Sequence, residues 1–116
     1  MQIINEVIES FNEYIQQIEN GGERIAEILR QEQYDSALEL INQLAEGLIW
    51  MADVASKLTE QGISVELSIE SITEFLTEIN EGLEIKDFVL VADIFEYELD
   101  PFIKKLQPIK YIKVGN

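Results

Sequence analysis

Apolar residues near the start of the chain recur every three or four positions, as they do on one face of a helix. The stripe consists of Ile4, Ile8, Phe11, Ile15, Ile18, Ile25 and Leu29. It predicts one amphipathic helix over residues 2–31. Gly21 and Gly22 interrupt the stripe without shifting its phase, and each helix-interior glycine costs about 1 kcal/mol relative to alanine. Either another backbone passes close to these glycines, or the helix breaks there.

Two further helices are unusually rich in apolar residues. The first is predicted over residues 35–61, and Gly62 suits the position that follows a helix. The second is predicted over residues 87–106, with Asp87 as its N-cap. Pro101 lacks a backbone N–H and should kink this second helix. Both helices carry more apolar side chains than a single stripe toward a core requires.

Residues 63–70 fit two structures. Apolar and polar residues alternate strictly, which suits a strand, but Val65, Ile69, Ile72 and Leu76 also keep helical steps. A strand would need a partner, and only residues 109–114 could offer one. Because a two-stranded hairpin is marginal by itself, we predict a helix over residues 65–82 that ends near Gly82.

These helices together predict an all-α protein with the architecture of an up-and-down four-helix bundle. A chain of 116 residues suffices for one domain with a substantial core. We place that domain at residues 1–106. Residues 107–116 are expected to form a short basic tail.

The charge is strongly acidic, because 23 acidic residues stand against 8 basic ones and the net charge is −15. Such a chain repels the phosphates of nucleic acids and of anionic membrane surfaces, so we expect neither as a partner. No apolar run approaches the roughly 18 residues of a membrane span, and the first residues show no secretory signal. Cysteine is absent, which fits a reducing compartment, and we expect a cytoplasmic protein.

Histidine is absent as well, which removes many common catalytic and metal-binding motifs. Neither a Ser-His-Asp triad, a zinc site of the usual nitrogen and sulfur ligands nor a di-iron bundle motif can be written. Carboxylates remain, and Asp53, Asp93 and Glu96 are candidates for buried or functional acids. A carboxylate-based metal-binding protein or enzyme is one alternative, and an acidic mimic of nucleic acid is another. We expect no enzymatic activity and no cofactor.

Residues 92–101 read Ala-Asp-Ile-Phe-Glu-Tyr-Glu-Leu-Asp-Pro. This A-D-x-x-E-Y-E-L-x-P pattern resembles a signature of small all-helical bacterial domains of unknown function. The resemblance implies a helical fold and an association with motility and surface-glycosylation neighbourhoods, and it assigns no functional residue. The expected shape is also similar to that of flagellar secretion chaperones, which are small acidic helical bundles.

The excess apolar surface favours a protein–protein interaction module, such as an adaptor, a chaperone-like protein or a homo-oligomer. Tryptophan and methionine are favoured at interfaces. Candidate interface residues are Trp50, Met51, Val54 and Tyr97, although Trp50 and Met51 also fit a core. We expect the partner to be a second copy in a homodimer, or another protein.

Overall fold

The computed structural model describes residues 2–111, and within that range the protein is all-helical, with no strand. The fold-class prediction of an all-α protein is confirmed for these residues. The helices are α1 (Gln2–Gln17), α2 (Gly21–Arg30), α3 (Tyr34–Glu60), α4 (Ile69–Glu84), α5 (Phe88–Asp93), the π-helix η1 (Ile94–Leu99) and α6 (Asp100–Lys104). Helices α5, η1 and α6 follow one another without a break, so they form one continuous helical segment.

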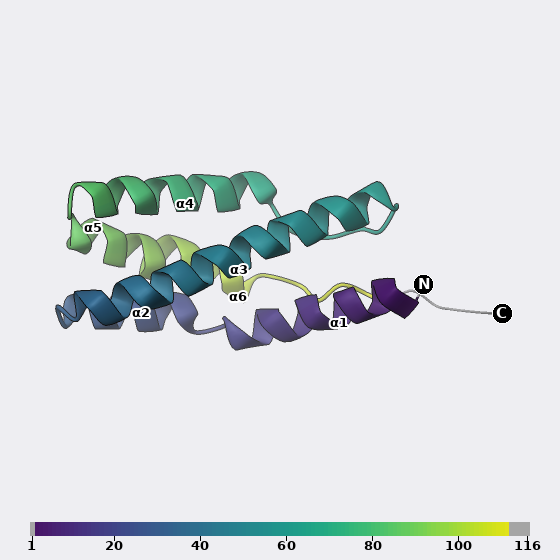
Figure 1. The fold of residues 1–116 in the computed structure, drawn as a ribbon, viewed down its shortest axis with the longest axis horizontal. Coiled ribbons are helices and arrows are strands. Elements are labelled where there is room, and N and C mark those ends of the chain that lie inside the picture. The colour runs from purple at the N-terminus through teal and green to yellow at the C-terminus, as the bar shows by residue number, and fades with distance from the viewer. Residues whose placement is uncertain (1, 112–116) are drawn as a thin grey trace.

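The molecule is long and narrow, with extents of 56 × 21 × 20 Å. Its radius of gyration is 15.6 Å, whereas a compact domain of this length would have about 13 Å. Helix α3 runs along almost the whole length, and its 27 residues span about 40 Å. Helices α1 and α2 follow one another beside it in the opposite direction (Figure 1).

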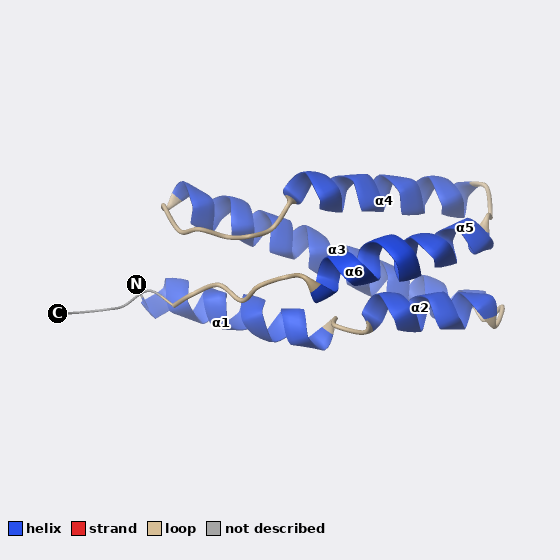
Figure 2. Ribbon diagram, turned by 180° about the vertical axis from the view of Figure 1, so that it is seen from behind, coloured by secondary structure: helices blue, strands red, loops and turns tan. Residues whose placement is uncertain are grey.

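The two ends of this rod are built differently (Figure 1). At one end, α2, the first half of α3, α4 and the α5–η1–α6 segment lie side by side; we call this the four-helix end. At the other, α1 and the second half of α3 are accompanied by non-helical chain, and we call this the open end. Figure 2 shows the chain after α6 returning beside α1, toward the N-terminus.

The prediction of one helix over residues 2–31 is wrong, because the chain turns at residues 18–20 and restarts as α2. The other expectation, that another backbone passes close to these glycines, is met as well. A Cβ atom added to Gly22 would lie 2.7 Å from the carbonyl oxygen of Phe95 and 3.1 Å from the Cβ of Asp100. Only glycine lets α2 approach the last helical segment this closely.

The helix predicted over residues 65–82 begins later, at Ile69, and ends at Glu84. Ser68 caps it, since its Oγ accepts a hydrogen bond from the Ser71 N–H at 3.2 Å. Residues 61–68 are a non-helical connector whose apolar side chains Ile63, Val65 and Leu67 pack against the core. Their alternation therefore reflects an extended segment with one buried side, without the second strand that a sheet would need.

The last helical segment begins at Phe88, and Asp87 caps it by accepting a hydrogen bond from the Leu90 N–H at 3.1 Å. A kink was predicted near Pro101; the structure has a π-helix over the residues before it, and the helix ends at Lys104, short of residue 106. The N–H of Asp100 bonds to the carbonyl of Phe95, five residues back. Proline supplies no N–H to the helical ladder, which favours such a rearrangement in the preceding turn.

Within the described residues, hydrogen bonds between Asn12 and Ile109 fasten the chain beyond α6 to α1. The Asn12 side chain accepts a hydrogen bond from the Ile109 N–H at 2.7 Å and donates one to the Ile109 carbonyl at 2.9 Å. The Ile109 side chain is buried in the core cluster. The first part of the predicted tail therefore covers α1, while residues 112–116, which include Lys113, lie outside the described residues.

Candidate functional site

A groove opens between α1 and α3 at the open end of the molecule, with a volume of about 560 Å³. We call it the α1–α3 groove. Its apolar lining consists of Ile3, Ile4, Val7, Trp50, Val54 and Leu58. Val54 and Leu58 are buried, whereas Ile3 is 74% exposed and Trp50 is 38% exposed. The groove therefore presents an apolar surface that is open to solvent.

Three aromatic rings pack together beside the groove, and one of them, Trp50, lines it. Gly47 has no side chain, and the phenol of Tyr14 occupies the space where a Cβ would stand. The ring of Trp50 meets Tyr14 edge-on at a centroid distance of 5.8 Å and lies 6.3 Å from the ring of Phe11. Partial burial raises the pKa of the Tyr14 phenol above its usual value. This cluster fixes Trp50 at the groove without covering it.

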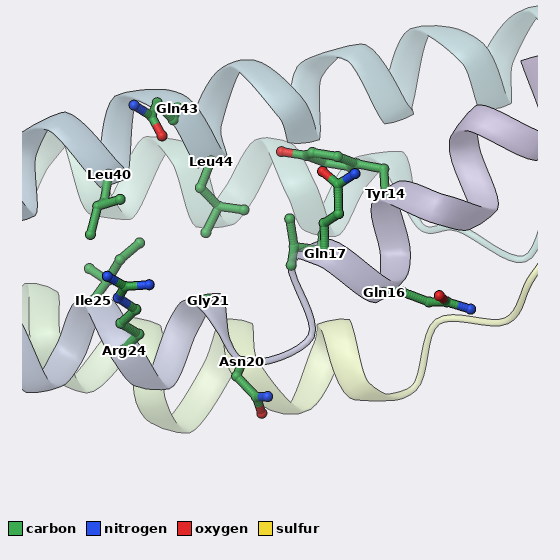
Figure 3. A pocket seen from close by; sticks show the side chains of 11 residues that line it. Tyr14, Gln16, Gln17, Asn20, Gly21, Arg24, Ile25, Leu40, Gln43 and Leu44 are labelled. Atoms are coloured by element: carbon green, nitrogen blue, oxygen red, sulfur yellow. The ribbon is translucent and has the colours of Figure 1, made fainter.

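A second hollow of about 440 Å³ lies beyond Tyr14, where the turn between α1 and α2 faces α3. Figure 3 shows Arg24 directed toward α3, and Gln43 on the opposite wall. This hollow is more polar than the α1–α3 groove. Arg24 makes no ion pair within the described residues, so its guanidinium is available to solvent.

Acidic side chains follow both helices that form the α1–α3 groove. On α3, Glu46, Asp53 and Glu60 are spaced seven residues apart, and on α1 the same interval separates Glu6 from Glu13. Seven residues make nearly two helical turns, so each set forms a row along its helix. All five are exposed, and both Glu6 and Asp53 line the groove itself. We call these sets the acidic rows.

One lysine offsets part of the negative charge of the acidic rows. Lys57 Nζ lies 3.0 Å from Asp53 Oδ2, one turn earlier on α3. Both side chains are exposed, so solvent screens the pair and it adds little to stability.

The candidate acids Asp93 and Glu96 belong to α5 and η1 at the four-helix end, whereas Asp53 belongs to the second half of α3. Arg30 of α2 holds both, with Nη2 at 3.0 Å from Asp93 Oδ1 and Nη1 at 2.8 Å from Glu96 Oε1. Hydrogen bonds from Tyr97 and then from Arg30 lower the pKa of Glu96. The three candidates do not come together, and none of them is buried. Across the described chain, no three potential metal-ligating side chains are grouped to hold an ion.

Asp100 is a buried acid that the sequence analysis missed. Its residue exposure is 6%, and its Oδ2 pairs with Lys104 Nζ at 2.9 Å. This ion pair is the main reason why the pKa of Lys104 is raised. The other carboxylate oxygen, Oδ1, has no hydrogen-bond partner among the described residues. The spacing of Asp100 and Lys104, four residues apart beside Pro101, is the signal that could have revealed the pair.

The four candidate interface residues have different locations. Trp50 and Val54 both line the α1–α3 groove. Met51 is fully buried, which agrees with its alternative place in the core and not with an interface. Tyr97 is 67% exposed, but it belongs to η1 at the four-helix end and lies apart from the groove. The contribution of α1, through Ile3 and Val7, was missed.

A second exposed apolar surface lies at the opposite end of the rod. Ile85, Val89 and Leu90 are exposed where α4 turns into α5. This surface provides a comparison for the α1–α3 groove, since it also exposes aliphatic side chains and lies at the other end of the rod.

The fold and the groove thus define a small all-α domain with an open apolar face. The chain belongs to the family described as "Domain of unknown function (DUF8042)", whose model matches residues 6–109. This finding confirms the resemblance to a domain of unknown function. No curated protein and no solved structure matches the chain. Among the described helices, none is both long and apolar enough to span a membrane.

Proposed function

We propose that this protein is a non-enzymatic protein–protein interaction module, of the adaptor or chaperone-like kind. In this proposal the helices form an up-and-down four-helix bundle that is complete at the four-helix end only. The α1–α3 groove is the observation that carries the proposal, because it exposes an aromatic anchor, Trp50, above a buried aliphatic floor. Interface hot spots are enriched in tryptophan and lie in such apolar depressions.

The proposed occupant is a helical segment of another protein. The groove runs between two antiparallel helices, and a third helix packed along it would cover the exposed Ile3 and Trp50 together. Recognition of this kind uses apolar anchors spaced three, four and seven residues apart on the partner. A non-helical partner would also have to satisfy its own backbone N–H and C=O groups within an apolar lining.

The homodimer predicted from the apolar excess is the competing occupant of the same groove. We also propose that the protein acts in the cytoplasm, which suits a chain without cysteine. Either partner would place its side chains within reach of residue 3, so one experiment addresses both.

The test is photo-crosslinking in the native cell, with a photoreactive amino acid at position 3 and, as a matched control, at position 85. Ile3 and Ile85 are 74% and 71% exposed, so neither replacement should disturb folding. We expect a discrete crosslinked product from position 3 and none from position 85. A product at twice the 13.3 kDa chain mass would identify the homodimer. Equal products from both positions, or none from position 3, would refute the proposed use of the groove.

A further inference from the structure

We infer that the helix accepted by the α1–α3 groove is cationic and amphipathic, with an apolar face for the groove and lysine or arginine on both flanks. This inference rests on the proposed function and adds the chemistry of the partner. The shape of the groove does not specify the charge of its partner, whereas the charged residues around the groove do.

The apolar part of the site sets the length and the pattern of the partner. From Trp50 to Gln61 the lining of α3 covers 11 residue steps, or about 17 Å. A helix of three to four turns would fill this length. Its anchors would pack on Trp50, Val54 and Leu58, which follow one another at four-residue intervals on α3.

The acidic rows determine the charge of its flanks. A helix lying along the groove would have Glu6 and Glu13 on one side and Glu46, Asp53 and Glu60 on the other. The intervals of seven residues correspond to about 10 Å along each helix. Basic residues on the partner at the same interval would meet Glu6 and Glu13 on one flank and Glu46 and Glu60 on the other, because Asp53 is already paired with Lys57. Lys57 is the exception in the lining, and Asp53 already neutralises it.

Charge also separates this partner from a second copy of the chain. A copy would bring its own acidic rows against those of the first, and each chain has a net charge of −15. Like charges facing one another at an interface are unfavourable and suppress the wrong pairing. A cationic helix would instead be attracted to the acidic rows, and the long-range field of the protein would accelerate its association.

The experiment titrates the protein with a synthetic helical peptide of about 18 leucine and lysine residues in an amphipathic pattern. Trp50 is the one tryptophan of the chain, so its emission reports the groove directly. Two control peptides are used: a scrambled sequence of the same composition, and the same pattern with glutamate in place of lysine. We expect a blue shift of Trp50 emission with the first peptide only, and weaker binding as NaCl rises from about 0.05 to about 0.5 M.

Two charge-reversal variants test where the peptide binds. Glu6→Lys/Glu13→Lys alters an acidic row of the groove, and Glu74→Lys/Glu81→Lys makes the same change, at the same spacing, on α4. All four side chains are exposed, so both variants should fold, which circular dichroism will verify. We expect the first variant to weaken binding about tenfold or more and the second by about twofold or less.

The unfavourable outcomes differ in what they overturn. Equal binding of the scrambled peptide, or equal losses in the two variants, would mean attraction by net charge alone and would refute the cationic-helix inference. A blue shift with the glutamate peptide would refute the charge preference and leave the interaction function standing. A dimer seen by light scattering, with Trp50 already shielded, would replace the cationic helix with a second copy. A lack of any peptide binding together with no crosslink from position 3 would overturn the proposed function as well.

Discussion

The two ends of the molecule use the same long helix, α3, but they surround it differently. At the four-helix end, Gly22 lets α2 approach the backbone of Phe95, and Tyr34 stacks on Phe88 at a centroid distance of 4.0 Å. At the open end, the connector and the chain after α6 stand where the third and fourth helices would be (Figure 2). One side-chain amide, from Asn12, fastens the latter. Extended chain covers less apolar surface than a helix does, and the α1–α3 groove is the part left uncovered.

This difference suggests a division of roles. Binding surfaces are commonly drawn from the less stable parts of a protein, because they must remain open to a partner. The four-helix end provides the packed core, and the open end provides the exposed anchor. Three predictions test this division.

The largest effect is expected from removing one buried phenylalanine at each end. Phe95 and Phe11 are both about 1% exposed. We expect Phe95→Ala to lower the free energy of unfolding by about 3–5 kcal/mol, because four helices enclose the cavity it would leave. Phe11→Ala should cost about 3 kcal/mol or less, since α1 can move to fill part of the space. Urea unfolding of both variants measures the difference, and a larger loss for Phe11→Ala would contradict our description of the open end.

A smaller effect, opposite in sign at two adjacent residues, is expected from the glycines that begin α2. Gly22→Ala would place a methyl group against the Phe95 carbonyl, where backbone must move, and should cost about 1–3 kcal/mol. Gly21→Ala would meet nothing closer than Leu44 at 3.9 Å, and should stabilise the protein by up to about 1 kcal/mol. Thermal and urea unfolding of the two variants should show opposite shifts. Losses of similar size in both would mean that the close approach is not specific to Gly22.

The smallest effect concerns the ion pairs of Arg30, which join α2 to the last helical segment. In Arg30→Gln the pKa of the Glu96 carboxyl should rise toward its ordinary value. It should remain below that value, because the hydrogen bond from Tyr97 still lowers it. Because folding lowers the pKa of Glu96, its ion pair with Arg30 stabilises the folded protein at pH values above the ordinary carboxyl pKa. That contribution is lost as the pH falls through the lowered pKa. Carboxyl titration by NMR measures the shift. Lys57→Gln at the open end is the control, and an equal change of the Glu96 pKa there would argue against a direct effect of Arg30.

Helix α3 was predicted almost to the residue, because its apolar period is continuous and Gly62 adopts the left-handed backbone that ends a helix. The break before α2 could not be decided from the pattern, since the turn at residues 18–20 preserves the phase of the stripe. The connector was assigned to a helix because Val65 fits both periods. Its extended form depends on core contacts that no local pattern specifies.

The candidate site was predicted in part. Trp50 and Val54 came from the excess of apolar residues on α3, but the same reasoning included Met51, because periodicity does not show which side of a wide apolar face is covered. Ile3 and Val7 fall outside the stripe of Ile4, Ile8 and Phe11, and this departure was the available signal for the second wall of the groove.

The sequence by itself determined the helical class, the acidic charge, the extent of α3 and the cap at Asp87, because these depend on residues close together in the chain. Only the tertiary structure decided that α1 and α2 are separate helices, that Met51 is core and that Asp100 is buried. It also decided that α1 and α3 leave a groove between their acidic rows. Those features depend on which segments meet in space. Helical periodicity shows that a side chain is apolar, but it does not show which other segment covers it.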